Sequence, residues 1–279
     1  MLSYLVFSFI LLRFSKCQLQ LLDPSNDLVS YWPFNNNYDD IIGGANLFNC
    51  INCSLTTDRF GNLNSALSLT SGYMQAPTGQ YFSENFSITA WCLYRAILDY
   101  ERILDFGNGP YKDNVILGLW INKNQLYGQV YNDTYTYDLT LATQPIKLNV
   151  WYHVAFVLDG QYGYIYLNGA LAGANLLNGC KAVNRTMNFI GRSNWYNYGD
   201  QNADAVYDDI KIFNRALNST EIVNEYNSSD NHSSLVMGSV WAPLPELEPQ
   251  AAIDNSSAPF YYDYYMNNLG GSSFKKEYL

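Results

Sequence analysis

The stretch WYHVAFVLDGQYGYIYLNG, residues 151–169 of the 279-residue chain, decides the fold class. Its first half alternates, and one apolar row would consist of Tyr152, Val154, Phe156 and Leu158. The dipeptide Asp159-Gly160 then breaks the pattern before a second run over residues 162–167. Asp-Gly between two alternating runs is a strong sequence signal for a β-hairpin. Residues 151–167 are therefore predicted to form two antiparallel strands.

Short alternating runs bounded by Gly, Asn or Asp recur on the N-terminal side of this hairpin. They cover residues 29–34, 66–69, 86–94, 102–106, 115–121 and 125–131. The run 86–94 is apolar on both faces, which predicts a central strand that is covered on both sides. One face holds Phe86, Ile88 and Ala90, and the other holds Trp91 and Leu93. Many short strands at this spacing favour an all-β fold, an antiparallel β-sandwich (jelly roll) of two packed sheets.

The composition excludes two broad classes of protein. Hydrophobic residues make up 48% of the chain, which is enough to fill a sizeable core and excludes a wholly disordered chain. The formal net charge is −10, so the chain would repel the phosphate backbone of a nucleic acid. Nucleic acids are therefore not expected partners.

Both ends of the chain differ from the strand-rich middle. The apolar run LSYLVFSFILL, residues 2–12, is about half the roughly 20 residues that a membrane-spanning helix needs. Small residues at Ser15 and Cys17 fit cleavage of a signal peptide after Cys17, with an uncleaved amphipathic terminus as the alternative. We predict a signal peptide over 1–17, one domain over 18–226 and a disordered tail over 227–279 that is rich in Asn, Ser and Pro. The domain would end in a helix over 219–226, capped by Ser219 or Thr220.

Secretion is also indicated by glycosylation sequons and cysteines. The sequons place candidate glycans on Asn52, Asn85, Asn132, Asn184, Asn218, Asn227, Asn231 and Asn255. Cleavage would leave four cysteines, an even number that favours disulfides outside the cell and allows three connectivities. These cysteines are Cys50, Cys53, Cys92 and Cys180.

Seven sequence blocks, spread over about 200 residues in a fixed order, carry a resemblance to a known family. They are SYWPF (30–34), GNLNSALSL (61–69), FSITAW (86–91), WYHVA (151–155) continuing to Asp159-Gly160, YLNG (166–169), FIGRS (189–193) and DDIKIFNRAL (208–217). On these blocks the chain resembles the laminin-G-like, concanavalin A-like lectin/glucanase jelly-roll domains, which are related to pentraxins. The resemblance implies a two-layered antiparallel fold, and it places a structural histidine at His153.

The same superfamily contains glycoside hydrolases, which use two carboxylates on one concave strand. None of the glutamates here forms an alternating acid pair on a predicted strand, and Asp99 and Glu101 flank Tyr100 in a stretch that reads as a loop. A nucleophilic triad would need His153 or His232, and neither has a motif around it. We therefore expect no enzyme activity and no catalytic residues.

Calcium is a possible cofactor that the resemblance implies, because relatives bind it through loop carboxylates and carbonyls. Asp113-Asn114 resembles the pair that pentraxins use, and Asn194 is the plausible ligand in the second half of that site. The other candidate metal ligands are Asp208 and Asp209 on the last strand, whose alternative role is to cap turns and accept backbone hydrogen bonds.

The resemblance also places several aromatic residues near the concave face of the sheet. Aromatic rings stack on sugar rings, and asparagine side chains bind hydroxyl groups. The candidate ligand-binding residues are Tyr111, Asn194, Trp195, Tyr196 and Tyr198. We expect a secreted, extracellular, non-catalytic module that binds a glycan or a matrix or cell-surface protein. The alternatives are an adhesion module without lectin activity and a glycoside hydrolase.

Overall fold

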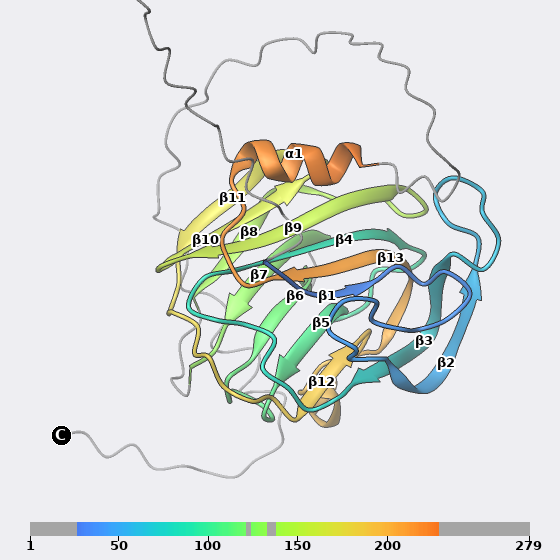
Figure 1. The fold of residues 1–279 in the computed structure, drawn as a ribbon, viewed down its shortest axis with the longest axis horizontal. Coiled ribbons are helices and arrows are strands. Elements are labelled where there is room, and N and C mark those ends of the chain that lie inside the picture. The colour runs from blue at the N-terminus through green and yellow to red at the C-terminus, as the bar shows by residue number, and fades with distance from the viewer. Residues whose placement is uncertain (1–26, 121–123, 133–137, 229–279) are drawn as a thin grey trace, which may run out of the picture. The chain divides into compact units, whose positions relative to one another are not determined.

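The computed structural model describes residues 27–120, 124–132 and 138–228, and this part of the chain is mostly β-strand (Figure 1). Its strands are β1 (Leu28–Trp32), β2 (Phe48–Thr56), β3 (Ala66–Ala76), β4 (Phe86–Tyr94), β5 (Arg102–Gly107), β6 (Val115–Trp120), β7 (Gln125–Val130), β8 (Leu139–Pro145), β9 (Trp151–Asp159), β10 (Tyr162–Leu167), β11 (Ala170–Leu176), β12 (Met187–Ile190) and β13 (Ala203–Phe213). A short 3-10 helix, η2 (Tyr196–Tyr198), lies between β12 and β13, and the helix α1 (Ser219–Asn227) follows β13. The predicted signal peptide, the tail beyond residue 228 and the sequons at Asn231 and Asn255 lie outside the described residues.

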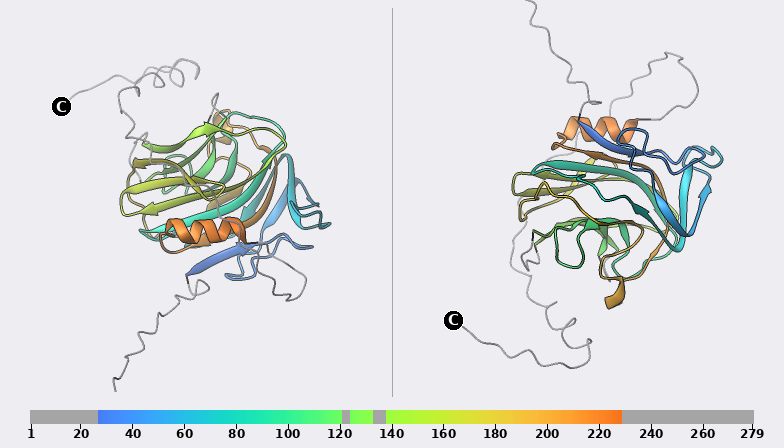
Figure 2. Two further views of the ribbon diagram at one scale, coloured as in Figure 1. Left: turned by 90° about the horizontal axis from the view of Figure 1, so that it is seen from above. Right: turned by 60° about the horizontal axis from the view of Figure 1, so that its bottom comes forward.

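The strands pair antiparallel and form one continuous curved sheet. Its order is β11-β10-β9-β4-β13-β3-β12-β5-β6-β7-β8, with β1 beside β13 and β2 beside β3. The long strand β3 belongs to both layers, because its first half pairs with β13 and its last residues pair with β12. The sheet therefore curls into two facing layers, so the predicted jelly roll is confirmed, although one sheet supplies both layers (Figure 2). We call them the β4 layer (β11 to β13) and the β6 layer (β12 to β8).

The hairpin that the sequence predicts is present. Asp159 lies opposite Tyr162, and the pairing of β9 with β10 continues without a shift as far as Val154 and Leu167. Gly160 has φ +61°, a conformation that glycine adopts without strain and that tight hairpin turns require. The turn chemistry therefore sets the register of the whole pair.

The core lies between the two layers. Strand β4 pairs with β9 on one side and β13 on the other, so it is central as predicted. Phe86 and Phe156 are fully buried, with ring centroids 5.4 Å apart. Gly128 on β7 of the β6 layer faces Phe156, and a Cβ there would clash with the ring. The Phe156 ring of the β4 layer therefore fits against the β6 layer where β7 lacks a side chain.

Helix α1 lies across the outer face of the β4 layer (Figure 2). Its Ile222 is fully buried in a cluster with Ala155 and Val157 of β9. The N-cap is Asn218, one residue earlier than predicted, because its side chain accepts a hydrogen bond from the backbone N–H of Glu221 and the Glu221 carboxylate accepts one from the backbone of Asn218. In the described part of the chain no helix is long and apolar enough to span a membrane.

Four strands have no counterpart in the sequence-based prediction, and one of them, β12, has only four residues. The other three are β2, β8 and β11; β2 and β11 have no buried residue, β8 has two, and β2 pairs only with β3. A strand without one continuous buried face shows no clean alternation of apolar and polar residues. The period that identifies β9 is therefore missing from these three.

Candidate functional site

The outer face of the β6 layer carries polar and aromatic side chains. Asp105 on β5 pairs with Ile116 on β6, and Ile116 pairs with Gln129 on β7, so these three side chains share a face. The alternate pair Leu104 and Leu117 belongs to the core. The segment of residues 193–200, which contains η2, is bonded to this outer face. We call this face and segment together the candidate site.

Asp105 is fully buried and organises the polar part of the candidate site. Its Oδ1 accepts hydrogen bonds from Nδ2 of Asn114 at 2.9 Å and from Nδ2 of Asn194 at 2.8 Å. Its Oδ2 accepts the backbone N–H of Asn194 at 2.8 Å. Burial raises the pKa of Asp105, while Arg102 and the amide donors counteract that rise. Asn114 and Asn194, which come from the two predicted halves of the pentraxin-like site, therefore both bind the carboxylate of Asp105.

A second buried network holds the other end of the segment. Asp200 Oδ2 accepts a hydrogen bond from Arg102 at 3.0 Å and one from the Ser193 hydroxyl at 2.6 Å. The Arg102 guanidinium also lies over the ring of Tyr127, 5.4 Å from its centroid. Residues 193–200 are thus bonded at both ends to groups that water does not reach. The segment is a rigid part of the fold.

The aromatic residues of the candidate site divide into anchors and exposed rings. Trp195 is only 5% exposed and packs edge-on against Tyr111, with the ring centroids 5.0 Å apart. Tyr196 and Tyr198 are 42% and 54% exposed. Of the five predicted ligand-binding residues, Asn194 and Trp195 hold the segment, Tyr111 is half-buried, and Tyr196 and Tyr198 present their rings to solvent.

The predicted calcium ligands at the candidate site retain two oxygens without a protein donor. Asp113 is mostly buried, and its Oδ2 accepts a hydrogen bond from Asn108 at 3.0 Å, while no described residue donates to its Oδ1. Asn194 Oδ1 is buried and has no hydrogen-bond partner. Oxygens of this kind suit a hard cation such as calcium. Among the described residues, no group of three or more His, Cys, Asp and Glu side chains gathers for a metal, so calcium at Asp113 and Asn114 stays a prediction.

The second predicted calcium site, at Asp208 and Asp209, is organised around an arginine. The Arg59 guanidinium lies 2.6 Å from Asp208 Oδ2 and 2.8 Å from Asp209 Oδ2. Tyr31 donates its hydroxyl to Asp209 Oδ1 at 2.7 Å. Burial and the neighbouring Asp209 raise the pKa of Asp208, and Arg59 opposes that rise. Because a guanidinium already supplies the positive charge between the carboxylates, this arrangement does not fit a calcium ion.

His153 lies beside this arginine cluster, on the outer face of the β4 layer. Its ring centroid is 5.4 Å from that of Trp91 and 6.0 Å from that of Tyr226 on α1. Burial, with smaller contributions from Lys211 and Arg59, lowers the pKa of His153 to about 3. The ring is therefore neutral near pH 7, which agrees with the structural role expected from the sequence.

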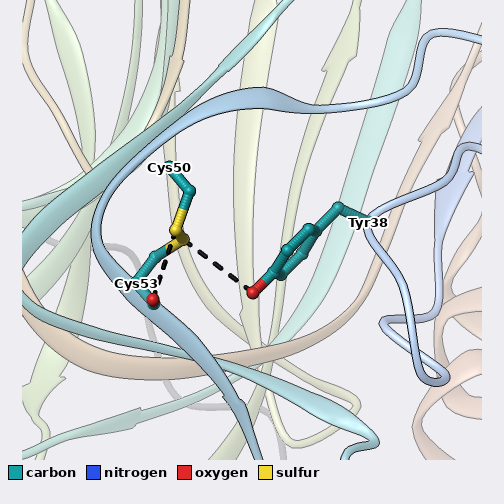
Figure 3. Close-up of a disulfide and its surroundings, with 3 residues drawn as sticks. All are labelled: Tyr38, Cys50 and Cys53. Atoms are coloured by element: carbon teal, nitrogen blue, oxygen red, sulfur yellow. Dashed lines mark hydrogen bonds between the residues drawn. A yellow bond between two sulfur atoms is a disulfide. The ribbon is translucent and has the colours of Figure 1, made fainter.

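The cysteines form one disulfide in the described chain. Cys50 and Cys53, both on the exposed strand β2, are bonded to each other, and the Tyr38 hydroxyl lies 4.0 Å from Cys53 Sγ (Figure 3). Cys92 and Cys180 are free thiols, and both are buried. Both belong to the core, and Cys180 also lies 3.3 Å from the Arg185 guanidinium. The predicted set of four thus gives one short-range bond and two free thiols.

The described sequons differ in what their side chains do. Asn52, Asn85, Asn184, Asn218 and Asn227 are exposed, and Asn132 is half-buried. Asn85 and Asn218 use only their side-chain oxygens, which accept backbone N–H groups at 2.7 and 3.0 Å. The amide nitrogen of Asn132 donates to the carbonyl of Gly179 at 3.1 Å. Glycosylation at these positions stays a prediction, and Asn132 is the least open of them.

Three functional groups were not found from the sequence. Asp105 was detectable, because it is a charged residue between the apolar residues Leu104 and Phe106 of a predicted strand. Arg59 had no such signal, because its carboxylate partners are far away in the chain, and Arg192 had none because its nearest ring, that of Tyr196, follows in a segment without a periodic pattern. The Arg59–Asp208 contact, for example, spans 149 positions.

Comparison with known proteins gives one family and several similar folds. The family described as the concanavalin A-like lectin/glucanases superfamily matches residues 68–223. No curated protein matches the sequence. Domain 4 of AbnA, a GH43 extracellular arabinanase from Geobacillus stearothermophilus solved with arabinotriose, has a TM-score of 0.53 at 17% identity, covering 71% of this chain and 97% of that domain.

Two toxin domains have similar folds. The binding domain of botulinum neurotoxin serotype G has a TM-score of 0.58 at 18% identity, covering 72% of this chain and 50% of its own. The binding domain of Paraclostridial Mosquitocidal Protein 1 has a TM-score of 0.56 at 16% identity, covering 74% and 53%. The chain thus spans about half of each toxin domain, and at these identities the likeness shows the fold alone.

Proposed function

Because the chain belongs to the concanavalin A-like lectin/glucanases superfamily, we propose that it is a secreted, non-catalytic module that binds glycans through the candidate site. Fold alone does not decide function, so the proposal rests on the site. The observation that carries it is the pair of exposed rings, Tyr196 and Tyr198, on a segment that buried hydrogen bonds hold rigid. Rings that are fixed before binding lose little conformational freedom when a sugar stacks on them.

Three buried carboxyl groups in and near the candidate site, those of Asp105, Asp200 and Glu101, support a non-catalytic role. Asp105 accepts hydrogen bonds from two asparagines, and Asp200 is bonded to Arg102 and Ser193. Glu101 is fully buried, and burial raises its pKa to about 8. A glycosidase needs two carboxyl groups that flank the scissile bond, about 5 to 10 Å apart. These three are instead occupied by, or enclosed within, the protein.

The neighbouring folds agree with glycan binding. The arabinanase domain was solved with arabinotriose, and its parent enzyme is extracellular. The disulfide between Cys50 and Cys53 is a bond typical of oxidising compartments, which supports secretion. We propose a neutral oligosaccharide such as arabinotriose as the first ligand to test.

The test is a glycan array followed by titration calorimetry on the full secreted chain. The double variant Tyr196→Ala/Tyr198→Ala is expected to weaken sugar binding at least about tenfold, since each stacked ring contributes roughly 1 kcal/mol. Tyr162→Ala is the matched control, because Tyr162 on β10 is 55% exposed, as open as Tyr198 at 54%. Equal loss in the control, or no sugar binding by the wild-type chain, would refute the proposal.

A protein-adhesion module is the second candidate. The exposed edge strand β2 favours it, with Phe48 and Ile51 exposed by 43% and 44%, because such an edge can add a strand from a partner. Inhibition by simple saccharides separates the two functions. Cell or matrix binding that sugars block supports the lectin, and binding that is indifferent to sugars supports adhesion. Release of reducing ends from bound oligosaccharides would instead indicate a hydrolase.

Calcium assistance at Asp113 is tested by thermal melting of the full chain in calcium and in excess chelator. A ligand that binds only the folded state raises the melting temperature by mass action. A shift that Asp113→Ala abolishes would establish the site. An unchanged melting temperature in both conditions would show that binding needs no calcium.

A further inference from the structure

Arg192, which follows β12, has no polar partner in the described part of the chain. The other arginines there are all bonded to oxygens: Arg59, Arg95, Arg102 and Arg215 to carboxylates, and Arg185 to the carbonyl of Asp113. Arg192 makes no hydrogen bond or ion pair with a described residue, although a guanidinium carries five N–H donors. No described residue therefore occupies its donors.

Aromatic rings hold this guanidinium in place. The Arg192 Cζ atom lies 4.1 Å from the ring centroid of Tyr196, 4.6 Å from that of Tyr73 and 5.3 Å from that of Phe189. Tyr73 and Phe189 also pack edge to face, 5.9 Å apart. Such stacking fixes the plane of a guanidinium while it leaves the N–H edges free. The arginine is thus oriented before any ligand arrives.

Further apolar side chains lie on the same face as the rings that flank Arg192. Ile51 pairs with Tyr73, and Phe48 pairs with Gln75, which in turn pairs with Phe189. Directly paired residues point to the same side of a sheet, so these side chains share the outer face. We call Phe48, Ile51, Tyr73, Phe189, Arg192 and Tyr196 the Arg192 surface. Its Tyr196 belongs to the candidate site, so the surface continues that site toward β2.

We propose that the Arg192 surface binds the carboxylate of an acidic saccharide, an inference that rests on the proposed glycan binding and specifies its ligand. The planar fork of a guanidinium matches a carboxylate in a bidentate pair. The rings beside it suit the apolar faces of a sugar. The whole chain has a net charge of −10, so general attraction cannot concentrate anions here. Recognition must instead come from this one oriented cation.

The test compares acids with their neutral counterparts on the full secreted chain, by titration calorimetry at low salt. One pair is trigalacturonic acid and its methyl ester, and the other is sialyllactose and lactose. These pairs separate a uronic acid from a sialic acid as the source of the carboxylate. At least one acid is expected to bind about tenfold more tightly than its neutral counterpart, the effect of one charge-assisted hydrogen-bonded pair. No preference for either acid would overturn the proposal.

Variants assign the preference to Arg192. Arg192→Gln is expected to abolish the preference for the acid while it leaves binding of the neutral sugar within about twofold, and Arg192→Lys is expected to retain only part of it. Lys147→Gln is the control, since it removes the same charge from an exposed position between β8 and β9. Thermal melting of each variant shows whether it folds. If a variant does not fold, the comparison of acid and ester on the wild-type chain still tests the proposal.

The outcomes separate this inference from the proposed function. Equal binding of acid and ester leaves glycan binding intact and removes only the role of Arg192. A preference for the acid that survives Arg192→Gln also removes that role. If neither the acids nor the neutral sugars bind, both the proposed function and this inference fail.

Discussion

Arg59 and Arg192 each lie between aromatic rings, and they differ in what faces the guanidinium. Arg59, between β2 and β3, lies over Trp91 and Phe60 at 4.4 and 4.3 Å and bridges the carboxylates of Asp208 and Asp209. Arg192 lies over Tyr73 and Tyr196 without any carboxylate among the described residues. A guanidinium held between aromatic rings therefore has a structural role at Arg59, where the protein supplies the carboxylates. At Arg192, where no described residue supplies one, it can bind the carboxylate of a ligand.

The largest expected effect is on the Arg59 side. Arg59→Met would leave two adjacent carboxylates that are 4% and 9% exposed without their cation. Removing one partner of a buried ion pair costs about 3–5 kcal/mol. We expect a loss of that size in the free energy of unfolding, measured by urea titration.

The matched control removes the carboxylates as well. Adding Asp208→Asn and Asp209→Asn to Arg59→Met leaves no uncompensated charge, so most of the lost stability should return. A triple variant as unstable as the single one would mean that Arg59 acts by packing on Trp91 and Phe60.

The next effect concerns pH, through His153 beside the Arg59 cluster. Its pKa is lowered to about 3 in the folded protein, from an ordinary value near 6.5. Between these values the unfolded chain binds a proton that the folded chain does not. Stability is therefore lost as the pH falls from about 6.5 toward 3, by up to about 1.4 kcal/mol per unit.

The variant His153→Phe should remove this part of the pH dependence while it keeps a ring beside Trp91 and Tyr226. Urea titrations at pH 4 and pH 7 measure it as the difference between wild type and variant. If the free energies of unfolding of wild type and variant differ by the same amount at both pH values, folding leaves the pKa of His153 unchanged. The buried ring would then be protonated at pH 4, which contradicts this prediction.

The sequence predicted most of the fold because local signals specify it. Asp159-Gly160 and the alternating residues of β9 fix a hairpin from neighbouring positions alone. The run 86–94 was recognised as central, because a strand between two others is apolar on both faces. Strand β2 was missed for the opposite reason, since its exposed residues need no periodic pattern.

The site was only partly predictable, because its contacts are long-range. The segment 194–198 was identified from its composition, and Tyr196 and Tyr198 are indeed exposed. Which residues anchor that segment could not be foreseen, since Asp105 meets Asn194 across 89 positions. The same holds for the carboxylates of β13, which the family resemblance made candidate calcium ligands and which face Arg59 in the structure.

A smaller effect compares one ring from each cluster. Tyr226 on α1 stacks on Trp91, with the centroids 5.7 Å apart, whereas Tyr196 covers Arg192 and is 42% exposed. Tyr226→Ala should cost about 1–2 kcal/mol, because it removes a stacked pair that joins the helix to the sheet. Tyr196→Ala should change the free energy of unfolding by no more than about 0.5 kcal/mol. Thermal melting of both variants measures the contrast. Equal losses of stability would mean that Tyr196 stabilises the fold as much as Tyr226 does.

The smallest expected effect is that of Arg192→Gln on stability. The side chain has no polar partner among the described residues, so its loss leaves no buried group unsatisfied, and we expect a change within about 0.5 kcal/mol. Arg95→Gln is the control, because Arg95 is also partly exposed, at 30%, but bonds to Asp204 at 2.8 Å and to Ser68 at 3.0 Å. The control should be the less stable variant in urea. If Arg192→Gln instead costs as much as Arg59→Met, the Arg192 surface is a structural cluster like the other one. Its guanidinium would then be held for packing and not for a ligand.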